Sequence, residues 1–320
     1  MISNILTMTP IVPIRYKYKG NEGCIYAKLE YYNPSGSIKD RVAHYICKKA
    51  IEKSQLKEKQ PIVETTSGNT GIAFAAYGAM TGHPVHIFMP DWASEERKNL
   101  MLMYGAQLHL ISREEGGFKG CLKKAITCAE EIGAYQPLQF KNPDNSNAHY
   151  YTTAQEILMQ VPDVTDFVSG VGSGGTIMGN GRRLKEARNA RITAIEPDTM
   201  ALLSGEEIKG PHRIEGIGDD FIPYIVDRSV IDKVHKINDA DAIIMAARLA
   251  KEIGLGVGIS SGANFLGAVL QSSEDPKNRV VVTIFADDNK KYITTDLSNP
   301  PEMTPGMISS QIELLGIASS

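Results

Sequence analysis

Short runs rich in β-branched residues alternate with longer amphipathic stretches, and this alternation constrains the fold more than any other feature. The expected strands lie near 62–65, 85–89, 107–111, 166–171, 191–196 and 279–285. The expected helices lie at 40–52, 70–80, 94–103, 117–132, 176–188, 239–253 and 262–271. Strands that are continuous apolar runs, separated by helices, are typical of parallel sheets covered on both faces. The sequence therefore predicts an α/β protein with twisted, mainly parallel sheets flanked by helices.

Turn-forming clusters of Asn, Pro and Gly divide the chain at 33–36, 142–145 and 299–301. We predict three parts from them: a smaller, mobile sub-domain over 40–145, a larger sub-domain made of 1–39 and 146–300, and a C-terminal tail over 301–320. The tail holds one short apolar run, which leaves both a docked and a loose tail open.

Composition excludes several classes of protein. The 320 residues are 42% hydrophobic and 22% charged, which is ordinary for a globular protein. The net charge of −3 is small and its signs are interspersed, so we expect no nucleic-acid partner. The chain has no signal-peptide pattern and no uninterrupted apolar run approaching about 18 residues. Four cysteines without a CxxC pair suggest thiols in a reducing compartment, so we expect a cytoplasmic, soluble protein with no membrane partner.

The segment EYYNPSGSIKDR leads through a turn into a helix and presents Lys39 in the first helical turn. A lysine beside Asp40 and Arg41 is, taken alone, more often a solvated charge. However, a helix N-terminus carries partial positive charge that disfavours an ammonium group. A desolvated lysine at this place has its pKa lowered toward the nucleophilic amine, which makes Lys39 a candidate catalytic residue.

A second segment, ETTSGNTG, joins an expected strand to an almost wholly apolar helix. Hydroxyl groups and backbone N–H groups at such a helix start form an acceptor site for a carboxylate. An ordinary N-cap is the alternative, although the polar residues exceed what capping needs. The candidate substrate-binding residues are Thr66, Ser67, Gly68, Asn69 and Thr70. Gln139, further along, is either another carboxylate contact or a loop hydrogen-bonder.

A third segment, SGVGSGGTIMG, follows an expected strand and opens a helix. Its backbone N–H groups would form a cup for a phosphate dianion, to which five residues contribute: Gly172, Ser173, Gly174, Gly175 and Thr176. The stretch also matches the GxGxxG pattern at 170–175, with Glu196 a suitable distance on, so an NAD(P)-dependent dehydrogenase is an open alternative. That alternative leaves the other two segments without a role. A cofactor that carries one phosphate and one aldehyde uses all three.

Ser260, in GVGISSGANF, is the fourth candidate. A hydroxyl that faces a pyridine nitrogen keeps the ring largely unprotonated, which suits β-elimination better than transamination. A plain helix cap explains this serine equally well. The seven histidines form no HExxH or paired ligand spacing, so we predict no metal site.

In this order, the four motifs resemble the cysteine synthase and cystathionine β-synthase family of pyridoxal-phosphate enzymes, from TPIV to KKYIT. The resemblance implies the tryptophan synthase β-like fold, known as fold type II, and a homodimer. It implies that Lys39 forms an imine with pyridoxal 5′-phosphate and that residues 66–70 and Gln139 bind the substrate carboxylate, with Asn69 also touching the cofactor. It further assigns the cofactor phosphate to residues 172–176 and the pyridine nitrogen to Ser260.

The same resemblance implies β-replacement on a small L-amino acid, such as O-acetylserine, cysteine or serine, through an α-aminoacrylate intermediate. Lys39 would move the α-proton, as in a transferase or lyase of sulfur amino-acid metabolism. Besides the dehydrogenase, a non-catalytic sensor of pyridoxal phosphate or an amino acid is open.

Two features bear on the choice of substrate. Asp219 and Asp220, in IEGIGDDFIP, resemble the cystathionine β-synthase form and would repel a phosphorylated leaving group. They could attract the ammonium group of an amino-acid thiol or act as a base for water or thiol, which favours use of cysteine with release of sulfide. A solvated Asp-Asp turn is the alternative. The segment 285–292 departs from the family pattern, which leaves its role open.

Overall fold

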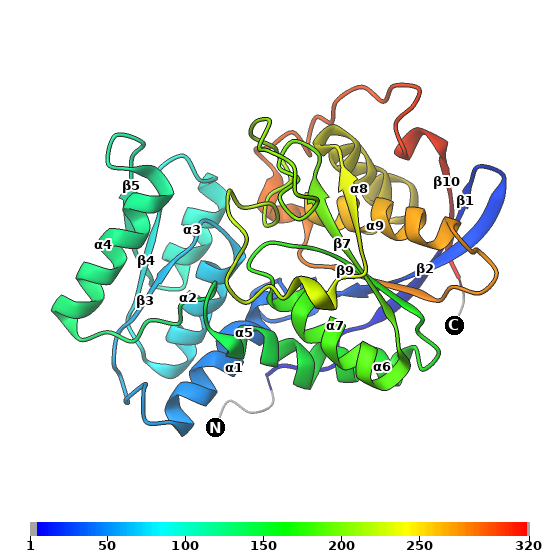
Figure 1. The fold of residues 1–320 in the computed structure, drawn as a ribbon. Helices are drawn as coiled ribbons and strands as arrows, with labels where there is room; N and C mark the ends of the chain where they lie inside the picture. Colours follow the sequence, from blue (N-terminus) through cyan, green and yellow to red (C-terminus); the bar gives the residue numbers. More distant parts are fainter. Residues whose placement is uncertain (1–4, 319–320) are drawn as a thin grey trace. The chain divides into compact units, whose positions relative to one another are not determined.

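The computed structural model describes residues 5–318 and divides into two compact units (Figure 1). The smaller unit is Asn33–Asn145 with the described residues before Met8; the larger is Met8–Tyr32 with the described residues from Ser146 on. Sequence analysis places the first boundary at 39/40, whereas residues 33–39 belong to the smaller unit. The reason is local, because the backbone N–H of Ser35 donates to the Asp40 carboxylate at 2.8 Å and ties the turn to its helix.

The smaller unit is built on a three-stranded parallel sheet in the order β3 (Ile62–Thr65), β4 (Val85–Pro90), β5 (Gln107–Ile111). Its helices are α1 (Lys39–Glu52), α2 (Asn69–Thr81), α3 (Glu95–Met103), α4 (Gly117–Ile132) and the start of α5 (Pro143–Ala148). Side chains alternate along β4: Ile87 packs in a cluster with α1 and α2, and Phe88 packs in a second cluster with α4. Both faces of this sheet are therefore covered.

The larger unit has a seven-stranded sheet in the order β10-β1-β2-β9-β6-β7-β8. The strands are β1 (Ile11–Tyr18), β2 (Asn21–Leu29), β6 (Asp166–Gly170), β7 (Arg191–Pro197), β8 (Lys233–Ile237), β9 (Val281–Phe285) and β10 (Ile312–Ile317). The helices are α6 (Ala154–Gln160), α7 (Gly175–Arg188), α8 (Asp239–Ile253) and α9 (Ile259–Ser273), with short helical turns η1 (Glu30–Tyr32), η2 (His149–Thr153), η3 (Arg228–Val230), η4 (Asn289–Tyr292) and η5 (Ser309–Gln311). In the order in which they lie in the sheet, the five strands β2, β9, β6, β7 and β8 run parallel, which confirms the predicted α/β class.

The C-terminal segment corrects the prediction of a separate tail over 301–320. Within it, β10 pairs antiparallel with β1, so that Ile312 lies opposite Tyr18. The buried carboxylate of Asp241 on α8 accepts the backbone N–H groups of Ile308 and Ser309 at 2.8 and 3.0 Å. Residues 308–317 are therefore part of the larger unit's sheet and its flank. Across residues 5–318, no helix is long and apolar enough to cross a membrane.

Candidate active site

Lys39 is the first residue of α1 and is partly buried. The turn before it is closed by Gly36, whose φ of +81° suits a glycine and whose N–H donates to the Asn33 carbonyl at 2.8 Å. The Ser37 hydroxyl accepts the backbone N–H of Lys39 at 3.2 Å. Asp40, the next residue, is fully buried, so this is not a solvated cluster of charges. The turn therefore presents Lys39 in one fixed place.

The loop over 66–70 leads into α2, and its cap residue is Gly68, which has no side chain to offer the helix start. The backbone N–H of Gly68 donates to the Thr66 hydroxyl at 3.3 Å. Thr66 and Thr70 are buried, whereas Ser67 is exposed. The first N–H groups of α2 lack an intrahelical acceptor, and the helix dipole adds positive potential there. The loop has the chemistry of a carboxylate site.

Gln139 packs against this loop, although it lies about seventy residues further along the chain. The Thr70 hydroxyl donates to its side-chain oxygen at 2.8 Å, and its side-chain amide donates to the Thr65 carbonyl at 3.2 Å. Both side chains are buried. The structure thus brings Gln139 together with the predicted carboxylate loop.

Glu64, at the end of β3, is a residue that sequence analysis missed. Its two carboxylate oxygens accept the backbone N–H groups of Thr65 at 2.9 Å and Gln139 at 3.3 Å, so that it holds the two parts of the site together. Burial raises the pKa of Glu64 to about 7, against the opposing effect of the backbone donors. The only signal in the sequence is an acidic residue in an otherwise apolar strand.

We expect Glu64→Gln to flatten the pH dependence of stability. The folded-state pKa is raised, so between the ordinary value of 4.5 and about 7 the folded protein keeps a proton that the unfolded chain releases. Stability should therefore fall as pH rises through this window, by up to about 3 kcal/mol, and then level off. Urea unfolding at several pH values measures this, with exposed Glu130→Gln as the control. An unchanged slope in Glu64→Gln would contradict the assignment.

In the glycine loop over 172–176, Gly174 is the cap residue of α7 and has a φ of +87°. A Cβ on Gly172 would lie 2.2 Å from the carbonyl oxygen of Gly216, and a Cβ on Gly174 would lie 2.4 Å from Val226. Ser173 is buried, and the first turn of α7 holds no acidic side chain. The loop is a tight backbone cradle at a helix N-terminus, as a phosphate group requires.

The segment that carries Asp219 and Asp220 is joined to the strand end before this cradle. The backbone N–H of Gly218 donates to the Val171 carbonyl at 2.9 Å, and the Gly218 carbonyl lies 2.7 Å from a ring nitrogen of His212. Asp219 is partly buried and Asp220 is exposed. The structure thus brings the predicted acidic pair close to the glycine loop.

Ser260 is the second residue of α9 and is buried. Four residues on, Asn264 accepts the backbone N–H of Gly170 at 2.7 Å and donates to the Ile284 carbonyl at 2.8 Å. Asn264 therefore fixes the start of α9 against the ends of β6 and β9. Sequence analysis missed Asn264, although its place one turn after Ser260 was the available signal.

The segment 285–292, whose role could not be predicted from the sequence, contacts Gly258, the residue just before α9. The backbone N–H of Gly258 donates to the Asp287 carbonyl at 3.0 Å, and the buried Tyr292 hydroxyl donates to the Asp287 carboxylate at 2.7 Å. Asp287 itself is fully buried. The segment that departs from the family pattern therefore holds the chain just before the helix that carries Ser260, through the buried Asp287.

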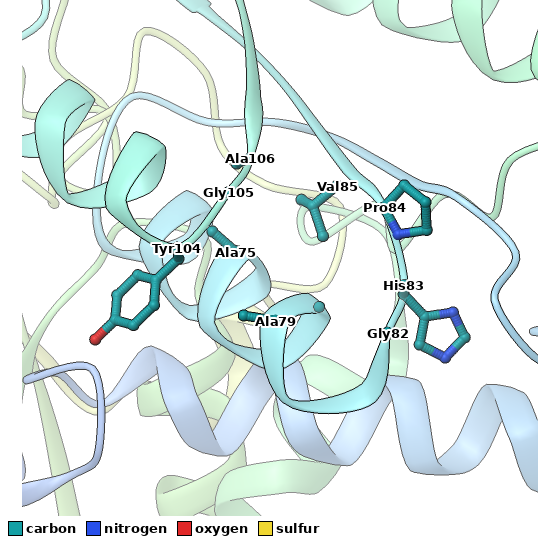
Figure 2. Close-up of a pocket in the computed structure, with 10 residues that line it drawn as sticks. Ala75, Ala79, Gly82, His83, Pro84, Val85, Tyr104, Gly105 and Ala106 are labelled. Atoms are coloured by element: carbon teal, nitrogen blue, oxygen red, sulfur yellow. The ribbon is translucent and has the colours of Figure 1, made fainter.

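A separate depression at the C-terminal end of α2 contains none of the predicted site residues (Figure 2). Its volume is about 200 Å³, and its walls include Ala79, His83, Val85 and Tyr104. We assign it no part in the reaction.

Comparison with known proteins identifies the family. Residues 2–287 match the model of the family described as pyridoxal-phosphate dependent enzymes. The chain belongs to this family. A cysteine synthase of Staphylococcus aureus is 42% identical over 299 residues, which cover 92% of this chain and 96% of that protein.

Two solved structures are similar to this pyridoxal-phosphate enzyme. A hydrogen sulfide-producing enzyme from Fusobacterium nucleatum is 48% identical with a TM-score of 0.95, over 99% of this chain and 97% of that one. An O-acetylserine sulfhydrylase from Entamoeba histolytica is 36% identical with a TM-score of 0.88, over 97% and 94%. The predicted resemblance and fold type are confirmed.

The protein is thus a pyridoxal-phosphate dependent β-replacement enzyme of the cysteine synthase type that acts on amino acids. The dehydrogenase alternative falls, because the family match spans the GxGxxG stretch at 170–175. The alternative of a non-catalytic sensor is excluded too, because the matched family and the similar proteins are enzymes. The cradle at 172–176, closed to any added Cβ at Gly172, fits the cofactor's phosphate.

Proposed function

We propose a role for each predicted site residue. Residues 172–176 hold the cofactor phosphate, Ser260 faces the pyridine nitrogen, and Lys39 attaches the cofactor through its side-chain amine. Residues 66–70 and Gln139 hold the substrate carboxylate, with Asn69 also touching the cofactor. The tight cradle at Gly172, the buried Ser260 and the contact between Thr70 and Gln139 support these roles.

Pyridoxal phosphate supplies an aldehyde for the substrate amine and a ring that withdraws electrons from the α-carbon. The protein's own residues do the rest. The Lys39 amine takes the proton from the substrate α-carbon, the β-substituent leaves with its bonding electrons, and the amine returns the proton to the α-carbon after the nucleophile has added at the β-carbon. The donors at the start of α2 and the Thr70–Gln139 pair orient the carboxylate, so that the α-proton points at a fixed base.

We propose further that the enzyme uses cysteine, releases sulfide and accepts water or a second thiol. The carrying observation is the bond from Gly218 to Val171, which fixes the Asp219–Asp220 segment beside the glycine loop. Two carboxylates disfavour an incoming hydrosulfide anion and favour the ammonium group of an amino-acid thiol. Asp220, which is exposed, is free to accept a proton from water or thiol as it attacks. The chain's 48% identity to a hydrogen sulfide-producing enzyme supports the use of cysteine with release of sulfide.

Product analysis tests the proposal. O-acetylserine, serine and cysteine are offered as donors, each with sulfide, homocysteine, cysteine or water as acceptor. We expect sulfide release from cysteine to fall about 100-fold in Asp220→Asn, because a general base contributes that order of rate. The reaction of O-acetylserine with sulfide should not slow and should become somewhat faster, because hydrosulfide needs no base and the variant removes one carboxylate that repels it.

Asp163→Asn, at another exposed aspartate of the larger unit, is the matched control for the loss of one charge. If Asp220→Asn leaves the rate with every acceptor unchanged, the role of the acidic pair is wrong. If the wild-type enzyme makes cysteine from O-acetylserine and sulfide but releases no sulfide from cysteine, the enzyme is a cysteine synthase. The 42% identity to the Staphylococcus aureus cysteine synthase favours this second candidate.

Assembly and location are carried over from the family resemblance. We propose a homodimer that works in the cytoplasm and binds neither nucleic acid nor membrane. The near-neutral charge of −3 supports the lack of a polyanion partner, and four cysteines without a disulfide suit a reducing compartment. Light scattering from the purified protein tests the dimer.

A further inference from the structure

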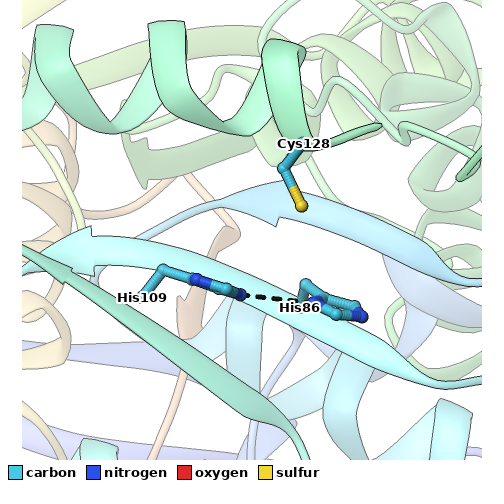
Figure 3. Close-up of side chains that lie close together, drawn as sticks. All are labelled: His86, His109 and Cys128. Carbon is cyan, nitrogen blue, oxygen red and sulfur yellow. Dashed lines mark hydrogen bonds between the residues drawn. The ribbon is translucent and has the colours of Figure 1, made fainter. Parts of the chain in front are cut away.

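Three side chains of the smaller unit meet on the sheet face that α4 covers. They are His86 on β4, His109 on β5 and Cys128 on α4 (Figure 3). Nδ1 of His86 lies 3.2 Å from Nε2 of His109, and one ligand atom from each of the three residues lies within 4.8 Å of the others. Figure 3 shows the Cys128 sulfur directed from the helix toward the two rings. None of the three belongs to the predicted active site.

Rigid elements hold this cluster in place. In the parallel register of β4 and β5, His109 lies opposite Phe88, and His86 is two residues before Phe88 on the same face. The Phe88 ring stacks on His109 with centroids 4.2 Å apart and planes within 4°. Phe88 also packs in one apolar cluster with Cys121 and Ala125 of α4, the helix that carries Cys128. Packing of aromatic and apolar side chains therefore holds the three ligand atoms in place without a metal ion.

The geometry suits a tetrahedral metal ion. Zinc bonds of about 2.0–2.1 Å to nitrogen and about 2.3 Å to sulfur place two nitrogen ligands about 3.3 Å apart, and a nitrogen and a sulfur about 3.6 Å apart. The observed nitrogen–nitrogen distance of 3.2 Å is close to the first value, and the limit of 4.8 Å leaves the thiol a short movement. Imidazole with thiolate is a borderline-to-soft ligand set, which favours zinc over calcium or magnesium. We propose that His86, His109 and Cys128 form a zinc site, contrary to the prediction of no metal site, because the three residues are far apart in sequence and only the fold brings them together.

A simpler explanation is a hydrogen bond between two neutral imidazole rings. That bond accounts for the histidine pair but not for the convergent thiol. Burial lowers the pKa of both histidines, which keeps them in the neutral form that binds metal. Burial also raises the pKa of the Cys128 thiol, so the ion has to displace its proton.

Two of the three proposed ligands border an open cavity. His109 and Cys128 line an open cavity of about 480 Å³, and Glu131, one helical turn after Cys128, lies on its wall. Lys124, also on the wall, is paired with Glu115 at 2.5 Å, which offsets its positive charge. Three protein ligands with a fourth position for water is the arrangement of catalytic zinc sites, and the cavity leaves room for such a water. Zinc here would join α4 to β4 and β5.

Zinc titration of the pyridoxal-phosphate-loaded enzyme, freed of added metal and thiols, tests the proposal. Competition with a chromophoric chelator should give about one ion per chain. We expect Cys128→Ser and His109→Gln each to weaken zinc binding at least about tenfold, as the loss of one ligand does. Cys24→Ser, at another partly exposed thiol, is the matched control and should bind like the wild type.

Two further readouts separate a lost ligand from a damaged fold. Zinc should raise the thermal midpoint of the wild type and of Cys24→Ser, but not of Cys128→Ser. Cobalt in place of zinc should give a thiolate-to-metal absorption band in the wild type and in Cys24→Ser. This band should be missing in Cys128→Ser. If the metal-free thermal midpoint or the cofactor spectrum of Cys128→Ser or His109→Gln is altered, His86→Gln is measured in place of that variant. Equal zinc affinity in wild type and ligand variants, or an equal loss in Cys24→Ser, would overturn the proposal.

Discussion

Lys39→Ala is expected to abolish β-replacement, with kcat/KM falling about 10⁴-fold or more, because under the proposed function it removes both the cofactor's attachment and the base that moves the α-proton. The visible absorption band of the covalently attached cofactor should disappear as well. Cofactor affinity should fall less than activity, because the proposed phosphate cradle at 172–176 is left intact. Steady-state kinetics and absorption spectra of the purified variant measure the three effects.

The control for Lys39→Ala lies on the same helix. Lys48 is exposed on α1, so Lys48→Ala removes one positive charge from this helix without touching the turn that presents Lys39. We expect wild-type activity and spectrum from it. Lys39→Arg should behave like Lys39→Ala, since a guanidinium keeps the charge but offers no nucleophilic amine. An active Lys39→Arg enzyme with the visible band intact would refute the assigned role.

Gly172→Ala is expected to weaken cofactor binding about 100-fold and to destabilise the larger unit by about 1–3 kcal/mol. The added Cβ would lie 2.2 Å from the Gly216 carbonyl oxygen, which belongs to the backbone and cannot turn aside as a side chain does. Either the glycine loop or the Gly216 backbone has to shift. The first movement spoils the N–H cradle, and the second disturbs the segment that leads to Asp219.

Titration of the apoenzyme with pyridoxal phosphate, together with thermal unfolding, measures both effects. Gly210→Ala is the control, because a Cβ there meets nothing within 4 Å and its φ is not in the left-handed region. We expect it to leave both quantities unchanged. Undiminished cofactor affinity in Gly172→Ala would mean that the phosphate binds elsewhere.

Features that depend on neighbouring residues could be predicted from the sequence. The helix expected at 117–132 is Gly117–Ile132, and the strand expected at 62–65 is Ile62–Thr65. Apolar periodicity and turn residues act over one or two helical turns, so the pattern contains the information. The catalytic motifs are local for the same reason, since a loop and the helix start that follows form each of them.

Some strands of the larger unit's sheet could not be predicted in this way. The strand β1 contains a proline, β8 (KVHKI) carries three polar residues and β10 is short, so their pairing partners decide that they are strands. The strand β10 pairs with β1 from the other end of the chain, and no local signal announces such a partner.

The sequence by itself determined the α/β class and the family's cofactor, and it predicted roles for Lys39 and the glycine loop, because each of these depends on short continuous segments. Only the tertiary structure decided which distant residues meet: Gln139 with Thr70, Asn264 with the Gly170 backbone, and His86 with His109 and Cys128. These contacts follow from strand register and helix packing, where one residue's shift moves a side chain to the opposite face.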